Sequence, residues 1–107
     1  MIRAVFFRNG EELTGFQISG HATAHENDEE GRLICSAVSS AAYMAANTIT
    51  EILKAEAQIS VDEGEMTLKI TSGYSKSCDA IIKGLKLHVS ELAKQNNGYL
   101  TIKTEAN

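Results

Sequence analysis

The stretch CSAVSSAAYMAANTITEILKA, residues 35–55, decides the fold that we expect. Its apolar residues recur at spacings of three and four, which is the period of an amphipathic helix with one buried face. Its alanines leave room for a sheet or another backbone to approach closely. We therefore predict a helix from about Cys35 to Ala55 that packs through Val38, Ala41, Ala42, Ala45, Ile49, Ile52 and Leu53.

Strand patterns flank this helix on both sides. Before it, residues 2–7 are β-branched and aromatic, and residues 13–19 alternate loosely around Phe16 and Ile18. The turn signal Asn9-Gly10 joins these two segments into a predicted antiparallel hairpin.

A second hairpin, a second helix and a last strand follow. Residues 58–62 and 65–72 are predicted strands joined at Glu63-Gly64, with Ile59 and Val61 facing Met66, Leu68 and Ile70. Residues 77–95 show the helical period again and stop before Asn97-Gly98, and residues 99–104 alternate as a strand.

The predicted order is therefore ββαββαβ over one domain, residues 1–107. Without its first strand this order is the split βαβ plan. We predict an α+β two-layer sandwich, in which two helices cover one face of a mostly antiparallel sheet.

Composition excludes several classes of function. The 107 residues carry 10 Lys and Arg against 14 Asp and Glu, a net charge of −4, which argues against a nucleic-acid-binding module. No uninterrupted apolar run approaches the ~18 residues of a membrane span. The first residues lack the pattern of a signal peptide, so we expect a cytoplasmic protein whose Cys35 and Cys78 are thiols.

A polar stretch from Gly20 to Gly31 precedes the first predicted helix and reads as a loop. It holds His21, His25 and an acidic run, and it has almost no large apolar side chain. We expect the part from Ala22 to Gly31 to be mobile without a ligand and to order when a substrate binds.

Cys35 lies where this loop meets the predicted helix. A thiol at a helix N-terminus is shifted toward the nucleophilic thiolate, and His21, just after a predicted strand, is the candidate base. The alternative is that Cys35 is only a small buried apolar residue. Ser39, one turn later, would share the face of Cys35.

Other candidate residues favour structural roles. Cys78 lies on the apolar stripe of the second predicted helix and reads as a core residue, and His88 has no partner nearby in sequence. His21 and His25 with the acids Glu26, Asp28, Glu29 and Glu30 would be a weak zinc site, because no apolar stripe holds such a helix in place. No glycine-rich phosphate loop is present, so we expect neither a cofactor nor a metal.

Gly20-His21-Ala22, the acidic loop, and then Leu33-Ile34-Cys35-Ser36-Ala37-Val38-Ser39 resemble the bacterial ribosomal-processing cysteine protease family, Prp. The resemblance extends along the whole chain in length and element order. It implies a small cytoplasmic homodimer that removes the N-terminal extension of a large-subunit ribosomal protein (number twenty-seven). By position, it implies that Cys35 is the nucleophile and His21 is its partner.

One position departs from the family pattern. The family has an aspartate three residues before its cysteine, and this chain has Arg32 there. A dyad supported by that carboxylate is therefore not implied, and Asp28, Glu29 and Glu30 are the acids that could replace it.

The sequence thus predicts a cysteine endopeptidase acting on the N-terminal segment of a ribosomal protein, with no nucleic acid or membrane partner. Cys35 attacks, His21 transfers the proton, and Gly20, Ser36 and Ser39 support the site, with helix-terminal N–H groups near Ser36 stabilising the oxyanion. The alternatives are a non-enzymatic ribosome-associated or regulatory dimer and a metal-binding module built on His21 and His25.

Overall fold

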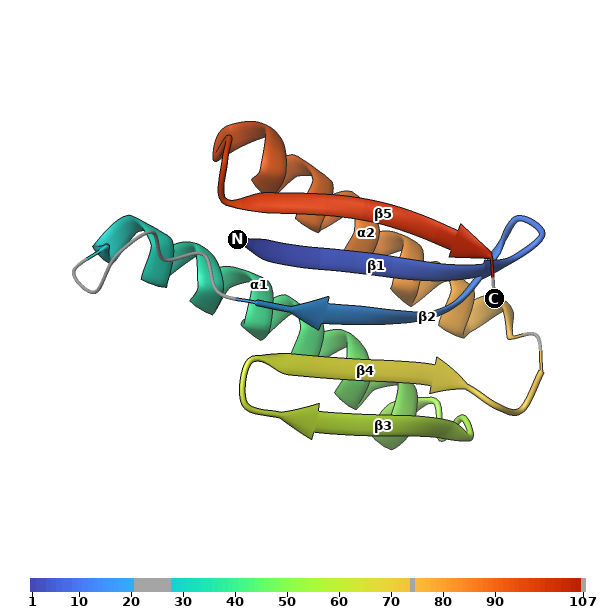
Figure 1. The fold of residues 1–107 in the computed structure, drawn as a ribbon. Coiled ribbons are helices and arrows are strands. Elements are labelled where there is room, and N and C mark those ends of the chain that lie inside the picture. Colours follow the sequence, from blue (N-terminus) through green and yellow to red (C-terminus); the bar gives the residue numbers. More distant parts are fainter. Residues whose placement is uncertain (21–27, 74, 107) are drawn as a thin grey trace.

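The computed structural model describes residues 1–20, 28–73 and 75–106, and it contains a five-stranded sheet covered on one face by helices (Figure 1). The predicted ββαββαβ order is confirmed. The elements are β1 (Ile2–Asn9), β2 (Glu12–Ser19), α1 (Glu29–Asn47), the π-helical turn η1 (Thr48–Ile52), β3 (Ala57–Asp62), β4 (Glu65–Ile70), α2 (Lys76–Gln95) and β5 (Leu100–Ala106).

The strands lie in the order β3-β4-β2-β1-β5. All neighbours are antiparallel except β1 and β5, which run parallel, so the sheet is mixed and mostly antiparallel as predicted. The register of the second hairpin pairs Ile59 with Leu68 and Val61 with Met66, which confirms the predicted facing. Both helices lie on the same face of the sheet (Figure 1).

The core fills the space between this face and the helices. It includes Val38, Ala42, Ala45 and Ile49 of the first predicted helix together with the inward faces of the central strands. The prediction that Ile52 and Leu53 also pack inward was wrong, because α1 ends at Asn47 and the π-helical turn that follows leaves both side chains exposed. Its largest fully buried side chains are Phe6, Phe16, Ile49, Leu68, Ile82, Val38, Val89 and Cys78. By length and composition the helical segment Glu29–Ile52 could cross a membrane. One stripe of this segment, which includes Ile34, Val38, Ala42 and Ile49, is buried against the sheet.

A β-bulge in the first hairpin explains its loose alternation. Phe7 pairs with Gly15 and Arg8 pairs with Leu13, so Thr14 is the extra residue. The Leu13 N–H donates to the buried Asp79 carboxylate of α2 at 2.8 Å, and Lys83 lies 2.9 Å from the other oxygen of that carboxylate. Asp79 thus fastens α2 to the hairpin at the bulge.

The first helix begins earlier than the sequence period suggests. We predicted a start near Cys35, whereas α1 begins at Glu29, six residues before it. Asp28 is the N-cap and accepts the Gly31 N–H at 2.9 Å, and Glu29 and Glu30 place negative charge in the first turn. The predicted loop to Gly31 is therefore wrong for residues 29–31, which are helical and not mobile loop.

Candidate active site

Cys35 lines a cavity of about 210 Å³ between α1 and the strand ends that face it. One wall is the flank of α1, with Cys35, Ser39 and Tyr43 at successive spacings of four. Ile2 of β1 and Ile18 of β2 form the apolar floor. The opposite wall is the hairpin of β3 and β4, from Val61 through Gly64 to Met66. The cavity therefore combines a thiol, hydroxyl groups and apolar walls.

Gly20 directly follows β2 at this cavity and is the residue before His21. Its φ of +88° is in the left-handed region, and a Cβ at this position would collide with the Met1 carbonyl oxygen. Its N–H donates to the Gly64 carbonyl at 3.0 Å. Glycine is thus the residue that fits here, which gives a physical reason for the glycine of the Gly-His-Ala motif.

The position of Cys35 corrects our argument from the helix terminus. Cys35 is in the second turn of α1, roughly 9 Å along the axis from the first helical residue, so the unpaired N–H groups of the first turn lie away from it. What distinguishes its thiol is access: Cys35 is half-buried at the cavity, whereas Cys78 is 1% exposed. The prediction that Cys78 is a core residue is confirmed.

The two serines near Cys35 fall on different surfaces. Ser39 lines the cavity with Cys35, as its spacing of four predicted. Ser36 is exposed and lines a separate hollow with Glu29, Arg32 and Leu33. Because Ser36 is inside α1, its N–H is directed along the helix, so the expected helix-terminal donors near it are not present. That part of the predicted oxyanion site was wrong.

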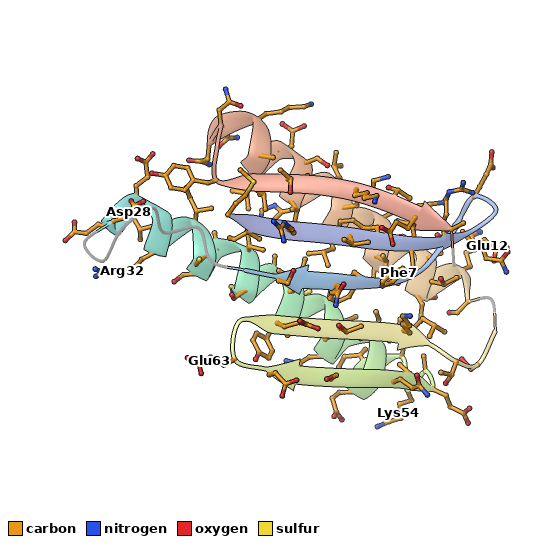
Figure 2. The ribbon with its side chains drawn as sticks, viewed as in Figure 1. Phe7, Glu12, Asp28, Arg32, Lys54 and Glu63 are labelled. Atoms are coloured by element: carbon orange, nitrogen blue, oxygen red, sulfur yellow. The ribbon has the colours of Figure 1, made fainter. Side chains whose placement is uncertain are left out.

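Asp28 and Arg32 lie at the end of α1 that projects past the sheet (Figure 2). The Tyr99 hydroxyl, at the start of β5, donates to the Asp28 carboxylate at 3.5 Å. Burial raises the pKa of the Tyr99 phenol, and the negative charges of Asp28 and Glu30 raise it further, so Tyr99 stays a neutral donor. Asp28 is thus a buried cap, two helical turns before Cys35.

Some predicted residues lie outside the described part of the chain. His21, His25 and Glu26 belong to residues 21–27, so neither the dyad distance nor the weak zinc site is tested by the structure. Among residues 1–20, 28–73 and 75–106, no group of three His, Cys, Asp or Glu side chains is arranged to hold a metal ion.

Sequence reasoning missed Tyr43 and the hairpin wall. Tyr43 is eight residues after Cys35 and so shares its helix face, a signal that was available in the sequence. Val61, Gly64 and Met66 carried no such signal, because the sheet order alone brings β3 and β4 to this flank of α1.

The fold is shared with solved structures of low sequence identity. The SMU.848 protein of Streptococcus mutans superposes with a TM-score of 0.83 at 20% identity, covering 100% of this chain and 96% of that one. The essential ribosomal processing protease Prp of Staphylococcus aureus, in complex with a covalently linked product peptide, gives 0.86 at 17% identity, covering 98% and 100%. The same protease with a substrate peptide gives 0.85 at 16% identity and the same coverage.

Curated protein sequences include no significant match to this chain. The model of the family described as cysteine protease Prp matches residues 1–101. That match spans nearly the whole chain, with the Gly-His-Ala motif, the cysteine helix and both β-hairpins inside it, and it ends at the start of β5. The chain therefore belongs to the Prp cysteine protease family and is a cysteine-type peptidase.

Proposed function

We propose that this peptidase removes the N-terminal extension of a large-subunit ribosomal protein (number twenty-seven), using Cys35 as nucleophile and His21 as general base and acid. The observation that carries the site assignment is the shared cavity, in which the accessible thiol of Cys35 lies with Gly20, the residue before His21. The second thiol, Cys78, is sealed in the core. The similar Staphylococcus aureus protein is a ribosomal processing protease with a bound substrate peptide, which supports the substrate class.

In the proposed reaction His21 takes the Cys35 proton, and the thiolate attacks the scissile carbonyl carbon to form a C–S bond. His21 then returns the proton to the leaving amine as the C–N bond breaks, which leaves a thioester on Cys35. Water, deprotonated by His21, attacks the thioester and releases the carboxylate and the thiol. The Ser39 hydroxyl lines the cavity, and we assign to it a hydrogen bond that stabilises the oxyanion.

The apolar floor and walls of the cavity support this chemistry. Ile2, Ile18 and Met66 are buried around it, so a bound peptide displaces water from the thiol and lowers the local dielectric. We also propose that the enzyme acts in the cytoplasm as a two-fold homodimer, in line with the family resemblance. Neither proposal requires a cofactor.

The decisive experiment incubates the protein with a peptide spanning the extension and the first mature residues of its own organism's ribosomal protein. Mass spectrometry should detect cleavage at a single peptide bond. It should also detect a thioester or an alkylated product on Cys35. Cleavage that survives in a Cys35→Ala protein would contradict the site. A peptide that stays whole, while other peptides are cut, would contradict the substrate.

A further inference from the structure

We propose that the free edge of β3 binds the substrate as an added β-strand and leads it to the Cys35 cavity. This inference rests on the proposed function, because it names the surface that holds the same peptide. β3 is the outermost strand beside β4, and Figure 1 shows no further strand along its outer side in the part of the chain that the structure describes. In Figure 2, Glu63 marks the turn at one end of this strand and Lys54 precedes the other end.

The register determines which backbone groups of β3 point outward. The Thr71 N–H donates to the Glu56 carbonyl at 2.9 Å, and the same antiparallel register continues to Asp62 opposite Glu65. In an antiparallel pair, the N–H and C=O of one residue point to the same side and alternate along the strand. Gln58, Ser60 and Asp62 therefore pair with β4, whereas the backbone groups of Ala57, Ile59 and Val61 point outward.

These outward-pointing positions also carry exposed apolar side chains. Ile59 is 44% exposed and Val61 is 50% exposed. They lie on the helix-side face of the sheet, because their partners Leu68 and Met66 are buried there. A peptide strand beside β3 would gain main-chain hydrogen bonds along the edge and would cover these two side chains.

The edge lacks the features that commonly block strand addition. The segment AQISVD has no lysine, arginine or proline, its one charged residue, Asp62, is the last of the strand, and its register with β4 has no bulge. The opposite edge, β5, carries Lys103 and Glu105, whose charged groups pair at 3.0 Å. Of the two edges of this sheet, β3 is thus the one left open to a partner strand.

Continuity with the cavity identifies the occupant. Val61 and Asp62, at the end of β3, line the same cavity as Cys35 and Ser39. A chain paired along the edge is extended, and an extended chain exposes its peptide bonds to a nucleophile. The cavity lies where such a chain passes the end of β3, so the occupant is the extended peptide that is cut.

Hydrogen exchange on the uncleaving Cys35→Ala protein tests this pairing residue by residue. The amides of Ala57, Ile59 and Val61 should exchange quickly alone and slow down when the extension peptide is added. The amides of Gln58, Ser60 and Asp62 should be protected in both states. Ile102 and Thr104, whose amides point outward from the opposite edge, serve as controls and should not change.

Kinetics with an altered edge provide a second test. Ile59→Pro removes one outward N–H while leaving the pairing with β4, and should lower kcat/KM for the peptide about 2–10-fold. Thr104→Pro makes the matched change on the opposite edge, where the Thr104 N–H points outward, and should behave as the wild type. The alkylation rate of Cys35 by iodoacetamide should be equal in all three proteins, which shows that the site remains folded.

The outcomes separate this inference from the proposed function. The wild type could cut the peptide while the exchange of the β3 amides stays unchanged and Ile59→Pro keeps full activity. That result would contradict peptide binding at the β3 edge and would leave the proposed function standing. Failure of the wild type to cut the peptide would overturn both. If the three outward amides are protected without peptide and Ile59→Pro turns a dimer into a monomer, a second copy covers the edge and the inference is wrong.

Discussion

The N–H of Gly20 donates a hydrogen bond to the carbonyl of Gly64 at 3.0 Å, which ties the end of β2 to the turn between β3 and β4. This contact fixes the residue that precedes His21 against the hairpin wall of the cavity. Gly20 also abuts the Met1 carbonyl, so the start of β1 belongs to the same junction.

Gly20→Ala should lower both stability and activity. The alanine Cβ adds strain at a φ of +88° and meets the Met1 carbonyl oxygen, for an expected loss of about 1–3 kcal/mol in the free energy of unfolding. Gly73→Ala is a matched control, because Gly73 has the same φ with open space around it. Urea unfolding should show a larger loss for Gly20→Ala, and equal losses would contradict the steric argument.

Cys35→Ala should abolish cleavage and leave the fold intact, because Cys35 lies at the edge of the core and is the proposed nucleophile. Cys78→Ala should keep the chemistry and lose about 0.5–3 kcal/mol of stability, because Cys78 is buried in the core. The measurements are peptide cleavage and the urea midpoint. A fully folded Cys78→Ala protein without activity would show that the wrong thiol was chosen.

His21→Ala should lower kcat by about 10²–10⁴-fold, the usual contribution of a general base. Stability should change little if the role of His21 is catalytic. His88→Ala is the control, because His88 is exposed on α2 and lines a hollow between the helices, outside the Cys35 cavity. Equal activity of the two variants in the cleavage assay would exclude His21 from the mechanism.

Asp79 should make stability depend on pH in acid. Burial pushes the pKa of Asp79 upward, but the hydrogen bond from the Leu13 N–H and the Lys83 ammonium outweigh it and hold the pKa below the usual value. A carboxyl group with a lowered pKa stabilises the fold above its unfolded pKa of about 3.9, and this contribution is lost as pH falls through the folded pKa.

Asp79→Asn keeps an acceptor for Leu13 and removes the charge. We expect it to cost about 1–2 kcal/mol at pH 7 and much less near pH 2, as measured by urea unfolding at both values. Asp62→Asn, at an exposed acid, should cost little at either pH. If Asp79→Asn lowers the free energy of unfolding equally at pH 2 and pH 7, the stability does not depend on the ionisation of Asp79 and the prediction is wrong.

The proposed homodimer should be visible in solution. The apolar side chains of Met44 and Leu87 are more than half exposed on the two helices, and a partner subunit would cover exposed apolar surface of this kind. Light scattering at micromolar concentration should give twice the 11.6 kDa chain mass. A monomer mass across the concentration range would contradict the dimer.

The sequence by itself determined the elements and their order. Helical spacing in α1 and α2 and alternation in β1, β2 and β4 reflect one buried face in each of these elements, and the local sequence carries that pattern. The apolar period did not give the start of the first helix. The Asp28 carboxylate accepts a hydrogen bond from the Gly31 N–H, and this cap starts α1 at Glu29, before the apolar period that begins near Cys35. The bulge at Thr14 likewise shifted the alternation of β2.

Only the tertiary structure decided what surrounds the thiol. The helix period predicts that Cys35, Ser39 and Tyr43 share one wall of the cavity. Val61 and Met66 reach the cavity only because the sheet places β4 beside β2 and β3 on the outer side of β4. Such pairings join residues far apart in the chain, and local sequence patterns do not specify which strands will be neighbours. Long-range hydrogen bonding between strands therefore built the opposite wall of the cavity and left the edge of β3 open.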